Sequence, residues 1–294
     1  MINMFDEVRK NKIKSVVLIL FFVAFIGFLG ILFGLYYNDP FSGLILAVIA
    51  GMFYLFISYS FGDKMILSIS GAREVTKKEY PYLFHAIEGL AVAANIPKPK
   101  AYVIDSPALN AFATGKSPET ASVAVTTGLL KSLNRQELEG VLSHEFSHVK
   151  NYDTRMMMLT AVLVGVIVRL SDFMFRSFLF GGRRDGERLH PAVILLSIFF
   201  AILAPIIGEL IKLAVSRRRE FLADASGAVL TRYPEGLASA LEKIKGSTAK
   251  LDTASSATAH LYISDPFAKT KKFLSGAFST HPPIDERIKR LRMM

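Results

Sequence analysis

Two long apolar runs near the start of the chain limit its possible folds more than any other feature. Residues 16–37 and 41–61 contain no charged side chain. As helices rising about 1.5 Å per residue, both are long enough to cross about 30 Å of hydrocarbon. A mean hydropathy of +0.37 and 51% apolar residues are also high for a soluble enzyme. We therefore expect two transmembrane helices near the N-terminus.

A cleaved signal peptide is the alternative interpretation of the first run. The run is longer than the about 7–15 apolar residues of a signal peptide, no small-residue cleavage site stands out, and a second run follows almost at once. These features favour a retained membrane anchor over residues 1–62.

Basic residues predict the orientation of this anchor. The loop between the runs, residues 38–40, has no basic side chain, whereas the outer flanks contain Arg9, Lys10, Lys12, Lys14, Lys64, Arg73, Lys77 and Lys78. Because cytoplasmic segments are enriched in Lys and Arg, residues 63–294 should face the cytoplasm. The absence of cysteine agrees weakly with that reducing compartment.

The net charge of +10 raises the question of a nucleic-acid partner. Much of this charge flanks apolar runs, where the anionic headgroups of a lipid bilayer are the nearer partner. We expect the chain to contact the bilayer and no nucleic acid.

The segment His144-Glu145-Phe146-Ser147-His148 forms an H-E-x-x-H pattern within a predicted helix over residues 136–150. Asn134 is a suitable N-cap, and Glu137 three residues later completes a capping box. Residues four apart share a helix face, so both imidazoles can bind one Zn²⁺ while Glu145 lies near the open coordination position. The alternative is a surface helix with two unrelated histidines.

A catalytic zinc site needs a third protein ligand, and Glu220 is the best candidate. Asp224 follows one helical turn later, where it can accept the other imidazole N–H of a ligating histidine. The alternative is a juxtamembrane helix end with ordinary charges. Three other histidines are weaker candidates for the third metal ligand, because we expect them to be structural or exposed to solvent: His85, His190 and His260.

Patterns on either side of the motif predict further secondary structure. A helix is expected over residues 81–94, and strands are expected over residues 101–104, 110–114 and 122–126. Residues 246–280 are rich in Ser, Thr and Ala, a composition typical of a mobile segment or flap.

A second apolar region follows the motif, with an uncharged arm over residues 192–208. Its first arm begins at residue 156 and contains Arg169, Asp172 and Arg176. The tip contains Arg183, Arg184 and Arg188. Because ionisable groups inside a bilayer are costly, we expect a membrane-embedded hairpin at about residues 156–215 and leave open whether it crosses.

The chain resembles the HtpX-type membrane metalloproteases and, more distantly, the prenyl-protein peptidases that trim lipidated C-termini. The match runs nearly end to end. It is carried by the paired apolar runs and by four motifs: Asn110-Ala111-Phe112-Ala113-Thr114-Gly115, His144-Glu145-Phe146-Ser147-His148, Arg219-Glu220-Phe221-Leu222-Ala223-Asp224 and His281-Pro282.

This resemblance implies a zinc metalloendopeptidase of the cytoplasmic membrane in a bacterium or archaeon. His144, His148 and Glu220 would bind one Zn²⁺ per chain, with Glu145 as the general base. The expected role is quality control of damaged or misfolded membrane proteins during stress, with polypeptide substrates and other membrane quality-control proteases as candidate partners. The expected fold is an α+β integral membrane protein whose zincin-like catalytic domain, residues 63–294, is interrupted by the embedded hairpin.

In the expected mechanism, Glu145 removes a proton from the zinc-bound water as it attacks the scissile carbonyl. By analogy with the family, His281 would stabilise the oxyanion; alternatively, it is a turn residue held by Pro282 and Pro283. Residues 110–114 would present an edge strand to which substrate adds, with Asn110, Ala111 and Phe112 in contact with it; alternatively, this is a plain core strand.

Two other classes of protein compete with the protease. A membrane scaffold or chaperone with structural zinc would not need Glu145, and structural sites usually close all four positions with protein ligands. A transporter would need paired broken helices with ligands at the membrane midplane, which the apolar runs lack.

Overall fold

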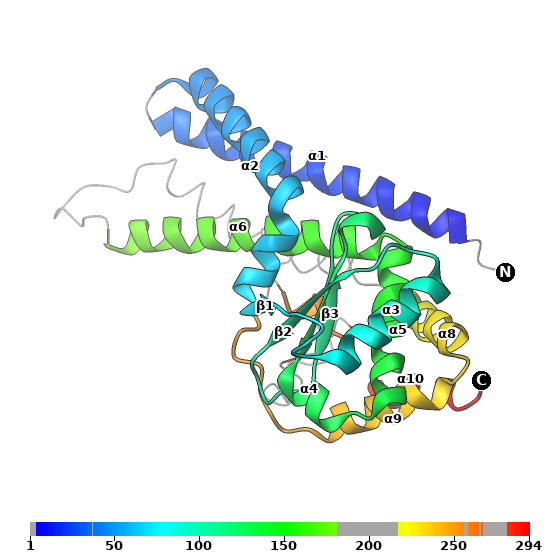
Figure 1. Ribbon diagram of the computed structural model, residues 1–294. Coiled ribbons are helices and arrows are strands. Elements are labelled where there is room, and N and C mark those ends of the chain that lie inside the picture. Colours follow the sequence, from blue (N-terminus) through cyan, green and yellow to red (C-terminus); the bar gives the residue numbers. More distant parts are fainter. Residues whose placement is uncertain (1–3, 37, 181–216, 256–257, 265, 267–280) are drawn as a thin grey trace.

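The computed structural model describes residues 4–36, 38–180, 217–255, 258–264, 266 and 281–294. Over these residues the chain is mostly helical with one small mixed sheet (Figure 1), which confirms the expected combination of elements. The helices are α1 (Met4–Tyr36), α2 (Pro40–Ile69), α3 (Pro81–Ala94), α4 (Thr127–Ser132), α5 (Arg135–Lys150), α6 (Asp153–Phe180), α8 (Arg217–Thr231), α9 (Pro234–Gly246) and α10 (Ile284–Leu291). The strands are β1 (Ala72–Glu74), β2 (Lys100–Ile104), β3 (Ala111–Thr114) and β4 (Ser122–Thr126), and the 3₁₀ turns are η1 (Pro118–Thr120) and η2 (Ala259–Leu261).

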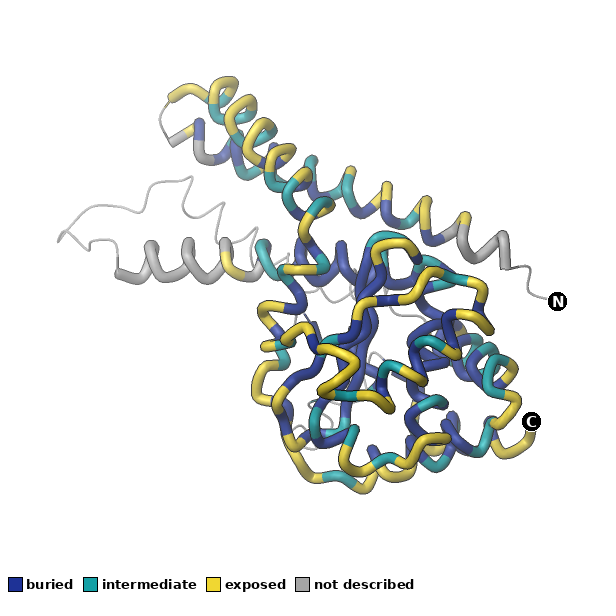
Figure 2. The backbone as a smooth tube through the Cα atoms, in the orientation of Figure 1, coloured by how far each residue is buried: buried dark blue, intermediate teal, exposed yellow. Residues whose placement is uncertain are grey.

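Helices α1 and α2 form the predicted N-terminal pair. Both are long and apolar enough to cross a membrane, over Asn11–Leu32 and Pro40–Ile69. A Cβ atom on Gly30 or Gly43 would collide with the other helix, so these small residues permit close packing. Large side chains such as that of Phe53 are exposed. Exposed positions recur along the pair in Figure 2, as expected for a surface that faces lipid.

The sheet has the order β1-β2-β4-β3, which leaves β3 at one edge. Strands β2 and β4 run parallel, while β3 is antiparallel to β4 and β1 is antiparallel to β2. The strands predicted over residues 101–104, 110–114 and 122–126 match the bounds of β2, β3 and β4 to within one residue. Strand β1 was not predicted because its three residues, Ala72, Arg73 and Glu74, carry no apolar alternation.

Each face of the sheet buries its own hydrophobic core. Alternate residues such as Val103 and Val123 pack with α3, α5 and α9 in the first core. On the opposite face, Ile104, Phe112 and Ala124 belong to a second core, which we call the anchor-side core. This core also contains side chains from the two N-terminal helices and from α6: Leu18, Phe22, Phe25, Leu55, Ile66, Met156, Met158 and Leu163. The membrane helices and the sheet are thus packed into one continuous unit.

Helix α5, which carries the H-E-x-x-H pattern, begins and ends close to the predicted bounds. Asn134 Oδ1 accepts a hydrogen bond from Glu137 N at 3.0 Å, and Glu137 Oε2 accepts one from Asn134 N at 2.8 Å. This is the predicted capping box. Beyond the helix, Tyr152 adopts a left-handed conformation with φ 59°, an uncommon choice for a bulky residue. The chain then enters α6 at Asp153.

Helix α6 contains the first arm of the second apolar region. Its residues from Met156 to Val164 are buried against α1, α2 and the sheet, and in Figure 1 the helix begins between the N-terminal pair and the part of the chain that contains the sheet. The second arm, residues 192–208, and the basic tip with Arg183, Arg184 and Arg188 lie outside the described residues. The embedded hairpin therefore remains a prediction.

The prediction of a mobile flap over residues 246–280 is wrong for residues 258–263. His260, Leu261, Tyr262 and Ile263 are almost fully buried. Tyr262 packs edge-on against Phe112 with ring centroids 5.2 Å apart, and Ile263 N donates a 2.9 Å hydrogen bond to Ala111 O. The average composition of residues 246–280 gave the wrong prediction here, because a few large apolar residues within a polar segment are enough to pack that part of the segment into the core.

Candidate metal centre

Three potential metal ligands from two helices meet inside the protein. His144 and His148 lie on one face of α5, and Glu220 lies in the first turn of α8. One ligand atom of each lies within 4.8 Å of the others, and all three residues are buried. The structure thus brings together the three residues that the sequence predicts as ligands.

The spacing of these atoms suits a metal ion. Tetrahedral zinc with bonds of about 2.0–2.1 Å places neighbouring ligand atoms about 3.3 Å apart. Here the two Nε2 atoms are 3.2 Å apart, His148 Nε2 is 3.4 Å from Glu220 Oε1, and His144 Nε2 is 3.7 Å from Glu220 Oε2. Two imidazole lone pairs at that separation repel each other unless a cation lies between them. The donor set therefore fits a divalent metal such as zinc.

A carboxylate orients each histidine from behind. His144 Nδ1 lies 2.9 Å from Asp224 Oδ1, and His148 Nδ1 lies 3.0 Å from Asp153 Oδ2. An N–H donated from Nδ1 leaves Nε2 unprotonated and directed at the common centre. The sequence predicts that Asp224 accepts the imidazole N–H of a ligating histidine. It gives no such prediction for Asp153, although this residue lies just beyond the helix that carries the H-E-x-x-H motif.

Arg287, a residue that the sequence reasoning missed, joins the C-terminal helix α10 to this arrangement. It is fully buried and donates to both oxygens of Asp224, from Nη2 at 2.7 Å and from Nε at 2.9 Å. Its Nη1 donates to Ile263 O at 2.9 Å, and its Nη2 lies 3.3 Å from His144 Nδ1. The only signal in the sequence was a basic residue shortly after His281.

Glu145 lies beside the donor set and is buried, with 2% of its surface exposed. Its Oε2 accepts a 2.9 Å hydrogen bond from the backbone N–H of Ala113 in β3. Burial raises the pKa of Glu145 to about 8. The carboxyl group is thus fixed at the edge of the sheet and titrates close to neutral pH.

His281 approaches the centre from the segment before α10. Its Nδ1 lies 2.9 Å from Glu220 Oε2, and the residue is buried. This contact explains part of the electrostatics of Glu220. Burial favours the neutral acid, but the charge and hydrogen bond of His281, together with both other histidines, hold the pKa of Glu220 well below its ordinary value.

The two histidines of α5 differ in their electrostatic surroundings. Burial lowers the pKa of His144 to about 4. Burial acts in the same direction on His148, but the hydrogen bond to Asp153 and the charge of Glu220 outweigh it and raise the pKa of His148 to about 9. The carboxylates of Asp153 and Glu220 therefore favour a positive charge beside His148, whereas burial disfavours one on His144.

The residues predicted to bind substrate lie along β3 and its approach. Asn110 Nδ2 donates to Ser264 O at 3.0 Å, and Phe112 is completely buried in the anchor-side core. Ala111 O accepts the hydrogen bond from Ile263 N described above. The contacts seen for these three residues are thus internal to the chain, and their role toward substrate stays a prediction.

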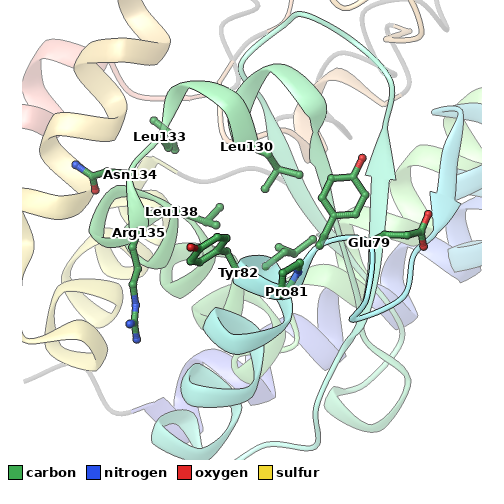
Figure 3. A pocket seen from close by; sticks show the side chains of 10 residues that line it. Glu79, Pro81, Tyr82, Leu130, Leu133, Asn134, Arg135 and Leu138 are labelled. Atoms are coloured by element: carbon green, nitrogen blue, oxygen red, sulfur yellow. The ribbon is translucent and has the colours of Figure 1, made fainter.

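Other features of the described residues lie away from this centre. His85 is exposed on α3, His190 is outside the described residues, and His260 is buried with Nε2 3.1 Å from Met157 O. A pocket of about 330 Å³ opens between the start of α3 and the α4–α5 junction (Figure 3). Its lining includes Pro81 and Leu138 but none of the three metal donors.

Comparisons with known proteins agree with this geometry. The model of "Peptidase family M48" matches residues 77–294. A "Protease HtpX homolog" of Dictyoglomus turgidum is 47% identical over 292 residues, which cover 99% of this chain and 94% of the relative. A "Protease HtpX homolog" of Listeria monocytogenes serotype 4a is 42% identical over 304 residues, covering 99% of this chain and 100% of the relative. The crystal structure of S. mikatae Ste24p has a TM-score of 0.51 at 21% identity, covering 98% of this chain and 67% of that one, and shows a similar fold.

A buried His-His-Glu donor set with a second glutamate at a sheet edge, attached to a pair of apolar helices, defines a membrane metalloprotease. The chain belongs to peptidase family M48, as the family match and the full-length relatives show.

Proposed function

We propose that this metalloprotease is a zinc-dependent endopeptidase of the cytoplasmic membrane that cleaves damaged or misfolded membrane proteins. The observation that carries the proposal is the convergence of His144, His148 and Glu220, with Glu145 beside them. Three protein donors leave a coordination position for water or substrate, which distinguishes a catalytic zinc site from a structural one.

Glu145 is the general base in this proposal. When bound, a zinc ion would supply a Lewis acid that acidifies water and polarises a peptide carbonyl. Glu145 takes the proton of the attacking water and returns it to the leaving amine. Burial raises the pKa of Glu145 to about 8, so its carboxylate is a stronger base than that of an exposed glutamate.

His281 is the proposed oxyanion donor. The hydrogen bond between its Nδ1 and Glu220 fixes the plane of the imidazole ring. A ring held in this way can direct an N–H at a developing negative charge, and such donors are effective because they are oriented before the reaction.

The outer edge of β3, whose main-chain groups now bond to Ile263 and Glu145, is the proposed substrate platform once substrate replaces these contacts. Ala111 and Ala113 direct their main-chain groups away from β4, because Ala111 O bonds to Ile263 and Ala113 N bonds to Glu145. A substrate strand that adds near Ala113 would therefore come to lie next to the general base. Main-chain recognition of this kind tolerates varied sequences, which suits the degradation of damaged proteins.

The proposed cytoplasmic orientation of the catalytic domain rests on the basic residues that flank α1 and α2. The preference for membrane proteins rests on the position of the site. Met156 belongs to the anchor-side core only eight residues after His148, so the donor set lies close to the membrane helices. Substrate loops and tails near the bilayer are the ones that this site can reach.

Metal removal and reconstitution test the proposal. The full chain, purified in detergent, should contain one zinc ion and cleave casein or a model membrane protein. Treatment with a chelator should abolish cleavage, and added zinc should restore it. Glu220→Ala should lose both the metal and the activity, whereas Glu242→Ala, which removes an exposed carboxylate, should keep both. A Glu220→Ala protein that retains full-affinity zinc would disprove the assignment of the third ligand.

A further inference from the structure

Asn11 is a buried polar residue at the start of the first candidate membrane span. Only 1% of its surface is exposed, and it lies in α1, far in sequence from every residue of the metal centre. Asn11 has no role in the proposed reaction, so the burial of this polar side chain must have another cause.

The amide of Asn11 connects three elements that surround the metal centre. Its Nδ2 donates to Asp153 Oδ1 at 2.6 Å and to Asn151 O, at the end of α5, at 3.1 Å. Its Oδ1 accepts a hydrogen bond from Arg219 Nη1 at 3.0 Å. Arg219 Nη1 also donates to Asp153 Oδ1 at 3.0 Å.

These contacts end directly behind two of the three donors. The other oxygen of Asp153 lies 3.0 Å from His148 Nδ1, and Arg219 immediately precedes Glu220 in α8. A displacement of Asn11 would therefore disturb the partner of one ligand and the helix turn that carries another.

We propose that Asn11 is a positioning residue through which helix α1 holds His148 and Glu220 in the geometry that binds the metal. This inference rests on the proposed function, since it assumes that His144, His148 and Glu220 bind the metal. Helix α1 is then a structural part of the metal centre as well as a membrane anchor.

The chemistry of the amide explains why asparagine is suited to this position. Both N–H groups meet an acceptor, and the carbonyl oxygen meets a cationic donor, so every contact has the correct polarity. Aspartate in the same place would keep the bond from Arg219 but would set a second carboxylate against Asp153. Alanine would leave Asn151 O and part of Asp153 without a partner in a buried site, which is costly.

A second contact fixes α1 at the same place. Lys12 Nζ lies 5.0 Å from the centre of the Tyr152 ring, a cation–π arrangement. Tyr152 is the left-handed residue that joins α5 to α6, between Asn151 and Asp153. The beginning of α1 is thus packed against the turn that directs Asp153 toward His148.

Zinc affinity of the detergent-purified full chain tests this inference independently of activity. Competition with a chromophoric chelator should give Asn11→Ala an affinity about 10–100-fold below that of the unaltered chain, the usual loss when a residue supporting a metal ligand is removed. The visible spectrum of the Co²⁺-substituted protein should also change in intensity, because the ligands move.

Ser15→Ala is the matched control. Ser15 lies one turn further along α1, is equally buried, and contacts α6 near Met156 Sδ, but it has no contact with Asp153. Its zinc affinity should stay within about twofold of the unaltered chain. If Asn11→Ala does not fold, the isosteric Asn11→Asp provides the same test, and it too should bind zinc more weakly.

The outcomes separate this inference from the proposed function. If the unaltered chain binds no zinc, the proposed function fails and the inference fails with it. If the unaltered chain and Ser15→Ala bind zinc and a folded Asn11 variant binds it equally well, the inference alone is overturned.

Discussion

The backbone N–H of Ala113 donates a 2.9 Å hydrogen bond to Oε2 of Glu145, which joins the edge strand β3 to the active-site helix α5. In the proposed mechanism, a substrate strand that extends the sheet at this edge replaces the hydrogen bond from Ile263 N to Ala111 O and comes to lie next to the carboxylate. In the proposed mechanism, one contact therefore links the positioning of substrate with proton transfer.

Glu145→Gln should retain the metal and lose cleavage. The amide has the same shape and can still accept a hydrogen bond from Ala113, but it cannot take up a proton. The loss should be about 10²–10⁴-fold in kcat, the range expected for a general base. Metal content and casein cleavage of the purified protein measure both effects, and a metal-loaded variant with unchanged kcat would exclude Glu145 as the base.

His281→Ala should lower kcat by about 10²–10³-fold with little change in KM, because an oxyanion donor acts mainly in the transition state. Steady-state kinetics on a fluorogenic peptide would separate the two parameters. An unaltered kcat would mean that His281 only supports Glu220 or the turn before Pro282.

Asp224→Asn should destabilise the fold by about 3–5 kcal/mol, because it leaves Arg287 as a buried cation without its charge partner. The exposed pair of Arg292 and Glu235 supplies the control, since Glu235→Gln should cost at most about 1 kcal/mol. Thermal unfolding in detergent compares the two variants. Equal effects would show that burial of the first pair has no energetic consequence.

Acidification should destabilise the protein partly through His260. Burial lowers the pKa of His260 to about 4, whereas an imidazole in the unfolded chain titrates near about 6.5. The unfolded state binds the extra proton between these values, so stability is lost as the pH falls below about 6.5. The expected loss is on the order of 2 kcal/mol at pH 5.

His260→Gln removes this titration and can still donate a hydrogen bond to Met157 O. Its unfolding midpoint should therefore fall less than that of the unaltered chain between pH 7.5 and 5. Because every other group titrates in both proteins, the difference isolates His260. Parallel shifts in the two proteins would contradict the assignment.

Cysteine labelling tests the orientation of the catalytic domain, since the natural chain contains no cysteine. Ser42→Cys lies in the first turn of α2, next to the loop between the N-terminal helices, and Thr248→Cys lies on the surface beyond α9; both positions are exposed. An impermeant maleimide should label the first variant in intact cells and the second only after lysis. The reverse pattern would place the protease outside.

Local patterns in the sequence predicted the elements whose signals lie within a few residues. The capping box, the His144/His148 spacing and the Glu220/Asp224 spacing each fit within one helix, where geometry follows from residue separation. Contacts between distant segments left no such signal. Asn11, Arg287 and Asp153 join the site through the packing of α1, α10 and the turn after α5, which no spacing rule describes. The buried turn around Tyr262 was missed for the same reason.

The anchor-side core has a practical consequence for the boundaries of this protease. The family match begins at residue 77, yet Ile104, Phe112 and Tyr262 are covered by α1, α2 and α6. A fragment starting at residue 77 would keep α6 but lose α1 and α2, so the apolar side chains of α6 that these helices cover would be exposed to water, at a cost of about 25 cal/mol per Å². We expect such a fragment to aggregate even in a buffer that suits soluble proteases. The segment that the family model matches is therefore shorter than the segment that must fold together.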